Sequence, residues 1–107
     1  MRRGEVYWVD FDPARGGEIQ KVRPAVIVSN NDSNRMLNRL QVVPLTSNTA
    51  RVYPFEALVH VGGVPHKAMA DQIRTVTKER VTNRMGVLPR ADLIEVERAI
   101  RVQLGLR

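Results

Sequence analysis

The chain has 107 residues, a formal charge of +6 and no cysteine. Its length predicts one domain over residues 1–107, and the lack of cysteine excludes disulfides, thiolate nucleophiles and cysteine-based zinc sites. Charged residues interrupt the apolar stretch that follows Arg2 and Arg3, so we expect no signal peptide, no membrane span and a cytoplasmic protein.

Short β-type segments fill the first half of the chain. β-branched and aromatic residues at 6–11 predict a strand, and a polar, glycine-containing loop follows over residues 12–22. The unbroken apolar run at 24–29 predicts a strand buried on both faces, and Asn30–Asn34 predict a turn that leads into one helical turn. Residues 40–45 predict the next strand, where Pro44 indicates an edge or a bulge because it cannot donate to a ladder.

The second half adds a hairpin and one helix. Residues 55–61 alternate as a half-buried strand does, and Gly62-Gly63 predicts a hairpin turn. Return strands are expected within 68–76 and 82–88. Residues 91–104 then carry the only good helical pattern, with Gly105 as its stop. The helical stripe, which we expect to be core, consists of Leu93, Val96, Ile100 and Leu104. These elements predict a mainly β protein: a small, strongly bent, barrel-like sheet with a C-terminal helix packed on it.

The positive charge is carried mainly by arginine. Of the 17 basic residues only Lys21, Lys67 and Lys78 are lysine. Arginine offers a planar fork of donors that suits phosphate, so the excess favours nucleic acid or another polyanion as partner. An arginine-rich proteome would give the same bias on solvated faces, and that alternative stays open.

Two neighbouring strands place polar groups where they could meet one phosphate. Arg23 precedes the run at 24–29, and Thr46-Ser47 follow the strand at 40–45. RNA cleavage requires fixed charge and hydrogen-bond donors around one phosphate, and it does not require a metal ion. The alternative is a surface ion-pair residue at 23 and a strand-end β-former at 46.

Other catalytic signatures are missing from the sequence. It contains no Gly-x-Ser-x-Gly elbow and no phosphate-cradling glycine loop that ends in Lys-Ser/Thr. His60 and His66 are the only imidazoles, and we expect both to be structural or exposed. The carboxylates are scattered, so we expect no metal and no cofactor.

An ordered set of short pieces resembles the MazF/PemK toxins of bacterial toxin–antitoxin pairs over essentially the whole chain. The pieces are Arg3 to Trp8, Asp12-Pro13, Gly17-Glu18, residues 23–30, Asn34-Arg35, residues 43–46, residues 71–75 and residues 104–106. The resemblance implies an SH3-like barrel of the MazF/CcdB/Kid type. It also implies a homodimer that cleaves single-stranded mRNA at particular sequences without a metal, arrests growth and is neutralised by a cognate MazE-like antitoxin.

The same resemblance assigns Arg23 and Thr46 as the catalytic pair. Glu18 is the nearest candidate to orient Arg23 or to accept a proton, and a salt bridge that holds its loop is the equal alternative. Some relatives place a histidine just before this glutamate and an arginine two residues before the later Asp-Gln. Here those positions are Gly17 and Met69, so a mechanism that uses that pair does not transfer.

Several polar residues are candidates to contact RNA, because cations position its backbone while amides and hydroxyls read base edges. They are Arg15, Gln20, Lys21, Ser47, Asp71, Gln72 and Arg74. Arg74 fits a solvated strand face equally well. Trp8 and Phe55 could stack bases, but core packing is the favoured interpretation for both.

Two other functions are compatible with this fold. The runner-up is a non-enzymatic toxin that binds a protein such as gyrase, and the third is a basic RNA-binding module without turnover. The protein-binding toxin has no need for the pair Arg23 and Thr46, and the RNA-binding module would leave RNA intact.

Overall fold

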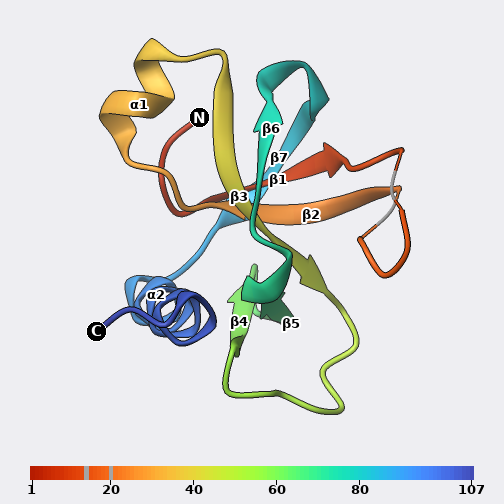
Figure 1. Ribbon diagram of the computed structural model, residues 1–107, viewed down its shortest axis with the longest axis vertical. Coiled ribbons are helices and arrows are strands. Elements are labelled where there is room, and N and C mark those ends of the chain that lie inside the picture. The colour runs from red at the N-terminus through yellow and green to blue at the C-terminus, as the bar shows by residue number, and fades with distance from the viewer. Residues whose placement is uncertain (14, 20) are drawn as a thin grey trace.

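Antiparallel pairing joins the strands into one strongly curled sheet, a half-barrel closed by a helix (Figure 1). The computed structural model describes residues 1–13, 15–19 and 21–107, and within them the strand order is β4-β5-β3-β2-β1-β7, with β6 paired to β3. The strands are β1 Glu5–Asp10, β2 Val22–Ile27, β3 Arg39–Thr46, β4 Glu56–Val61, β5 Val64–Met69, β6 Arg74–Thr77 and β7 Val81–Val87. The α-helices are α1 Asn31–Met36 and α2 Arg90–Leu104, and the 3₁₀ turns are η1 Ala70–Gln72 and η2 Lys78–Arg80.

β3 is the central strand, and it changes partner along its length. One edge pairs with β2, from Ile27 opposite Val42 to Ala25 opposite Pro44. The other edge pairs first with β6, over residues 39–42, and then with β5, over residues 45–46. Pro44 therefore lies in a buried central strand, and the expectation of an edge strand is wrong. Its missing N–H falls between the segments that pair with β6 and with β5, where it costs no bond on that edge.

Alternation divides the buried side chains of the sheet into two clusters. One contains Val6, Val26, Val43, Leu45, Val59 and Ala68, and α2 adds Val96 and Ala99 to it. The other contains Val9, Phe11, Ala25, Ile27, Leu40, Val42 and Val76. Because successive residues of a strand face opposite ways, β2 and β3 are buried on both faces, as the apolar run of β2 predicted.

The hairpin of β4 and β5 matches the sequence prediction closely. Val61 pairs with Val64 across Gly62 and Gly63, which have φ values of 57° and 81°. Positive φ at both central residues is the requirement of a tight two-residue hairpin turn, which glycine meets without strain.

α2 covers the free edge of β4. The Asp92 carboxylate accepts a hydrogen bond from the His60 amide at 2.8 Å, and the Arg98 guanidinium donates to the carbonyls of Pro54 and Glu56. The predicted stripe packs on the core through Leu93, Val96 and Ile100, whereas Leu104 is 53% exposed. Gly105 ends the helix in the left-handed conformation.

The expected fold class, mainly β with a C-terminal helix on a barrel-like sheet, is thus confirmed. Asn30 caps α1 by accepting from the Ser33 amide, as the Asn-rich turn predicted. Neither described α-helix is long and apolar enough to cross a membrane.

Glu5 ties the chain start to β7. Its Oε1 accepts from the Arg2 amide at 2.6 Å, and its Oε2 accepts from Nε of Arg84 at 3.0 Å. Burial alone would raise the pKa of Glu5, but the hydrogen bonds from Arg2 and Arg84 and the nearby terminal ammonium outweigh it and hold the pKa below its ordinary value. A lowered folded-state pKa means that Glu5 stabilises the fold above its unfolded pKa, and that this contribution is lost as pH falls through the folded pKa.

We predict that Glu5→Gln lowers the free energy of unfolding by about 1 kcal/mol at neutral pH. The difference in the free energy of unfolding between variant and parent should shrink below about pH 4, because the Glu5 carboxylate of the parent becomes protonated there and loses its charge. Urea unfolding over a pH series measures both effects, with Glu95→Gln as the exposed control. A difference that stays constant down to acid pH would contradict the role of the charge.

Candidate active site

Arg23 and Thr46, at adjoining ends of β2 and β3, line the same pocket of about 330 Å³. The last pair that joins these strands is Ala25 with Pro44. The two strands separate beyond that pair, and Arg23 and Thr46 each lie two residues past it, so strand alternation places both on the same face of the sheet. The two residues that the sequence singled out therefore lie together.

The Thr46 hydroxyl is oriented by the chain that follows it. Its oxygen accepts a hydrogen bond from the Asn48 amide at 3.3 Å. A hydroxyl has one proton to donate and two lone pairs, so the amide takes up a lone pair and leaves the proton to donate elsewhere. Thr46 is half-buried, which limits the directions in which that proton can point.

The charge that lines this pocket is positive. Lys21 and Arg23 contribute cations and Ser47 adds a second hydroxyl, while no carboxylate is among the described residues that line it. This combination suits an anion with several acceptor oxygens, which describes a phosphodiester.

Lys21 is held in place by its backbone. Its amide donates to Oδ1 of Asp12 at 2.8 Å, and its carbonyl accepts from the Phe11 amide at 2.9 Å. Lys21 also has a φ of 65°, which is uncommon for a residue with a side chain. The surrounding bonds thus hold a costly conformation in the residue that leads into Arg23.

The loop between β1 and β2 contains three further predicted site residues. Oε1 of Glu18 accepts from the Arg15 amide at 2.7 Å, and the Glu18 amide donates to the Arg15 carbonyl at 3.1 Å. Glu18 therefore closes a turn of its own loop and is not among the residues that line the pocket. Its carboxylate bonds to a backbone amide here, which differs from the salt bridge that was the alternative. Gln20 lies outside the described residues.

Of the predicted RNA contacts that follow β5, Gln72 bonds the same loop and Arg74 contacts Phe11 before it. Oε1 of Gln72 accepts from the Ile19 amide at 3.3 Å, and its Nε2 donates to the Gly17 carbonyl at 3.2 Å. The Arg74 guanidinium lies 5.6 Å from the centre of the Phe11 ring. Asp71 is exposed on η1. None of the three lines the pocket, and their contact with RNA stays a prediction.

Five lining residues of the pocket were not predicted as site residues, namely Trp8, Val22, Pro24, Leu45 and His66. Of these, Trp8 and His66 had been considered, and were assigned to the core and to a structural or exposed position. Trp8 is 37% exposed, so the prediction that it belongs to the core is wrong. The strand register shows why Trp8 lies at the pocket: it pairs with Pro24, which is the neighbour of Arg23. Phe55 is half-buried and stacks on Tyr53, with ring centres 5.4 Å apart.

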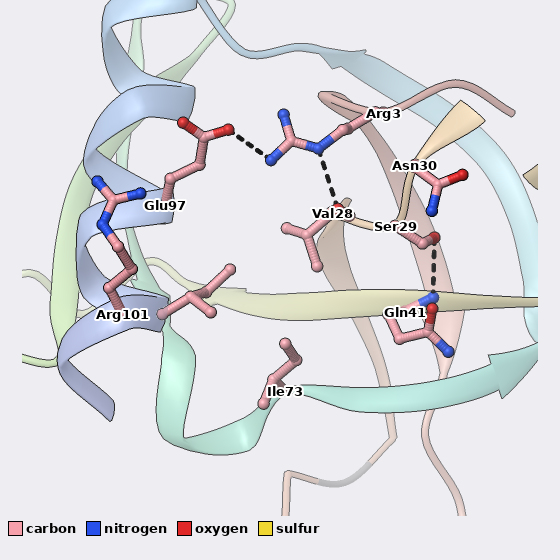
Figure 2. Close-up of a pocket in the computed structure, with 9 residues that line it drawn as sticks. Arg3, Val28, Ser29, Asn30, Gln41, Ile73, Glu97 and Arg101 are labelled. Carbon is pink, nitrogen blue, oxygen red and sulfur yellow. Dashed lines mark hydrogen bonds and ion pairs between the residues drawn. The ribbon is translucent and has the colours of Figure 1, made fainter. Parts of the chain in front are cut away.

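A larger cavity of about 520 Å³ lies between α2 and the far ends of β2 and β3. Figure 2 shows Arg3 reaching across it to Glu97, with 2.6 Å between nitrogen and oxygen, while Nε of Arg3 donates to the Val28 carbonyl. Arg3 and Arg101 both line this cavity, but the Glu97 carboxylate pairs with Arg3 and would repel a phosphate, whereas no carboxylate is among the described residues that line the smaller pocket. We therefore assign the functional site to the smaller pocket, although the other is larger.

Comparison with known proteins identifies the relatives of the chain. Residues 2–104 match the family described as PemK-like, MazF-like toxin of type II toxin–antitoxin system. The chain is 44% identical to "Endoribonuclease MazF9" of Mycobacterium tuberculosis, with 99% of this chain and 98% of that protein covered. It superposes on a crystal structure of MazF from Deinococcus radiodurans with a TM-score of 0.87 and 29% identity, covering 99% of this chain and 97% of the other. A mycobacterial endoribonuclease in complex with its cognate antitoxin gives a TM-score of 0.84 at 28% identity, covering 100% and 97%.

The two bonds of Gln72 predict a structural role in the loop. Gln72→Ala should speed hydrogen exchange at the Ile19 amide, because that amide loses its acceptor. Amide exchange followed by mass spectrometry measures it, with Gln103→Ala on the exposed end of α2 as the control. Unchanged protection at Ile19 would show that Gln72 does not hold the loop.

Proposed function

Since the chain belongs to the PemK-like, MazF-like toxins of type II toxin–antitoxin systems, we propose that it is an endoribonuclease that cleaves single-stranded mRNA at particular sequences without a metal ion. The observation that carries this proposal is the common pocket of Arg23 and Thr46. Relatives that are named endoribonucleases agree with it over nearly the full length of the chain.

The reaction needs no group beyond the RNA and the protein. The ribose 2′-hydroxyl attacks the adjacent phosphorus, so an O2′–P bond forms while the P–O5′ bond breaks. The 2′-hydroxyl proton passes to a base, and the departing O5′ takes up a proton. The products are a 2′,3′-cyclic phosphate and a 5′-hydroxyl end.

Arg23 and Thr46 act on the charge that builds up during this step. The phosphoryl oxygens become more negative as the new bond forms, and donors already fixed around them stabilise that state. Arg23 supplies a permanent cation with forked donors. Thr46 donates its hydroxyl proton to the phosphate. The oxygen of this hydroxyl already accepts a hydrogen bond from the Asn48 amide.

Proton transfer uses groups other than this pair, because arginine stays protonated. Gly17 and Met69 stand where some relatives have a histidine and an arginine, so those two groups are not available here. Glu18 stays our predicted proton acceptor, and because it does not line the pocket, its loop must bring the carboxylate closer for it to act. Lys21 and Ser47 line the pocket and contact the RNA beside the scissile phosphate, and Arg15 meets the backbone farther along the loop.

The partner that controls this activity is an antitoxin. A relative of the same fold is known in complex with its cognate antitoxin. We propose that an acidic segment of a MazE-like partner folds into the cationic pocket and displaces RNA. The working form is a cytoplasmic homodimer in which the groove spans both subunits.

The direct test is incubation of the purified protein with a defined single-stranded RNA in EDTA. We predict discrete fragments with 5′-hydroxyl ends from the parent protein. Arg23→Ala should abolish cleavage, and Thr46→Val, which keeps the shape but removes the donor, should lower the rate by about 10²–10³-fold.

Matched variants separate chemistry from folding. Arg39→Ala removes a cation from β3 at the end opposite to Thr46. Thr77→Val removes an exposed hydroxyl from β6. Both should cleave at the parent rate. If Arg23→Ala unfolds, or if Thr46→Val cleaves as fast as the parent, the assignment of the pair is wrong.

Binding should depend strongly on salt. We predict that the logarithm of the RNA association constant falls with the logarithm of salt concentration by roughly 0.7 for each phosphate contact. Fluorescence anisotropy of a labelled RNA measures the slope, and Lys21→Ala should reduce it by one contact. A flat response to salt would refute the electrostatic account of the pocket.

A further inference from the structure

The pocket of Arg23 and Thr46 has a second wall of different chemistry. Trp8, Pro24, Leu45 and His66 also line it. Leu45 belongs to the core cluster that contains Val26. The other three each lie two residues along their strand from a member of that cluster, namely Val6, Val26 and Ala68. Alternation therefore sets these side chains on the side opposite to Arg23 and Thr46, across the gap where β2 and β3 no longer pair.

His66 is a buried imidazole with one ring nitrogen in use. The side chain is 6% exposed, and Nδ1 lies 3.1 Å from the Val64 carbonyl oxygen. Since a carbonyl only accepts, Nδ1 carries the proton and Nε2 is an acceptor. Among the described residues no buried side-chain nitrogen or oxygen lacks a partner, so Nε2, which bonds no protein group, reaches solvent.

Trp8 provides the aromatic surface of this wall. It is 37% exposed although it stands in a central part of the sheet, between β2 and β7. Tryptophan in such a position usually packs inward, and an exposed indole beside a cationic pocket is suited to stacking a base.

We propose that Trp8 and His66 form a nucleobase subsite in which a base next to the scissile phosphate stacks on the indole and donates an N–H to Nε2 of His66. The proposal rests on the proposed function and deepens it, because it names a residue that reads sequence. Splayed bases of single-stranded RNA are recognised by this combination of stacking and edge hydrogen bonding. The phosphate then lies against Arg23 and Thr46 while its base occupies the opposite wall.

The chemistry of Nε2 limits which base edge fits. An acceptor at this point pairs with an amino or imino N–H and leaves a carbonyl oxygen unsatisfied. Burial makes an unsatisfied polar group costly, so His66 discriminates at one position of the RNA sequence.

The single tryptophan of the chain reports on the subsite directly. We would map the cleavage site by sequencing the 5′ ends of products, and then titrate the protein with a short RNA of that sequence whose scissile nucleotide is 2′-deoxy. Without the 2′-hydroxyl the RNA binds but is not cleaved. Trp8 emission should change in step with the anisotropy of the labelled RNA.

Two substitutions at residue 66 divide the roles of the imidazole nitrogens. His66→Asn keeps a donor near Nδ1 for the Val64 carbonyl but removes the acceptor at Nε2, whereas His66→Gln places an amide oxygen near Nε2. His66→Asn should lower kcat/KM for the preferred sequence by about tenfold and relax the cleaved sequences at one position. His66→Gln should restore most of that preference, and His60→Asn on the neighbouring strand should leave it unchanged.

The outcomes separate this proposal from the proposed function. Cleavage by His66→Asn with the parent rate and sequence preference overturns the subsite and leaves the ribonuclease intact. Bound RNA that leaves Trp8 emission unchanged also overturns it. If the parent cleaves no RNA, the proposed function fails, and the emission of Trp8 on binding a single strand still decides the subsite.

Discussion

The separation of β2 from β3 after Ala25 and Pro44 is the constraint on which the site depends. Up to that pair the two strands are buried together in the core. Beyond it β3 turns to pair with β5, and β2 continues toward Lys21 beside β1. The two ends diverge (Figure 1). The pocket is lined by residues from both ends. Because both ends are anchored by sheet pairing, the side chains around the pocket are held before any ligand arrives.

The two walls of this pocket follow from strand alternation. Residues on one face of β2 and β3 place Arg23 and Thr46 toward the phosphate, and the next residue on each strand continues the hydrophobic core. A shift of one residue in the register would exchange the two faces and remove the cation from the site. The buried runs that stabilise the sheet therefore also fix the positions of the polar groups.

Local sequence signals predicted the local parts of the fold. Gly62-Gly63 specified a turn, alternation in β4 specified its buried face, and Gly105 ended α2. The family resemblance predicted that Arg23 and Thr46 belong to one site. The local sequence pattern alone left that assignment undecided. Trp8 was assigned to the core, because its local pattern does not show whether other elements cover that side of β1. The exposure of Leu104 was missed for the same kind of reason, since the helical stripe does not show where its packing on the core stops.

A double-mutant cycle in kcat/KM tests most directly whether Arg23 and Thr46 bind the same phosphate. Arg23→Lys and Thr46→Val would be measured singly and together on the mapped RNA sequence. Side chains that act on the same transition state are not independent, so we predict a loss in the double variant that is clearly smaller than the product of the single losses. Losses that multiply without coupling would contradict the account, because they would place the two side chains at separate points along the RNA.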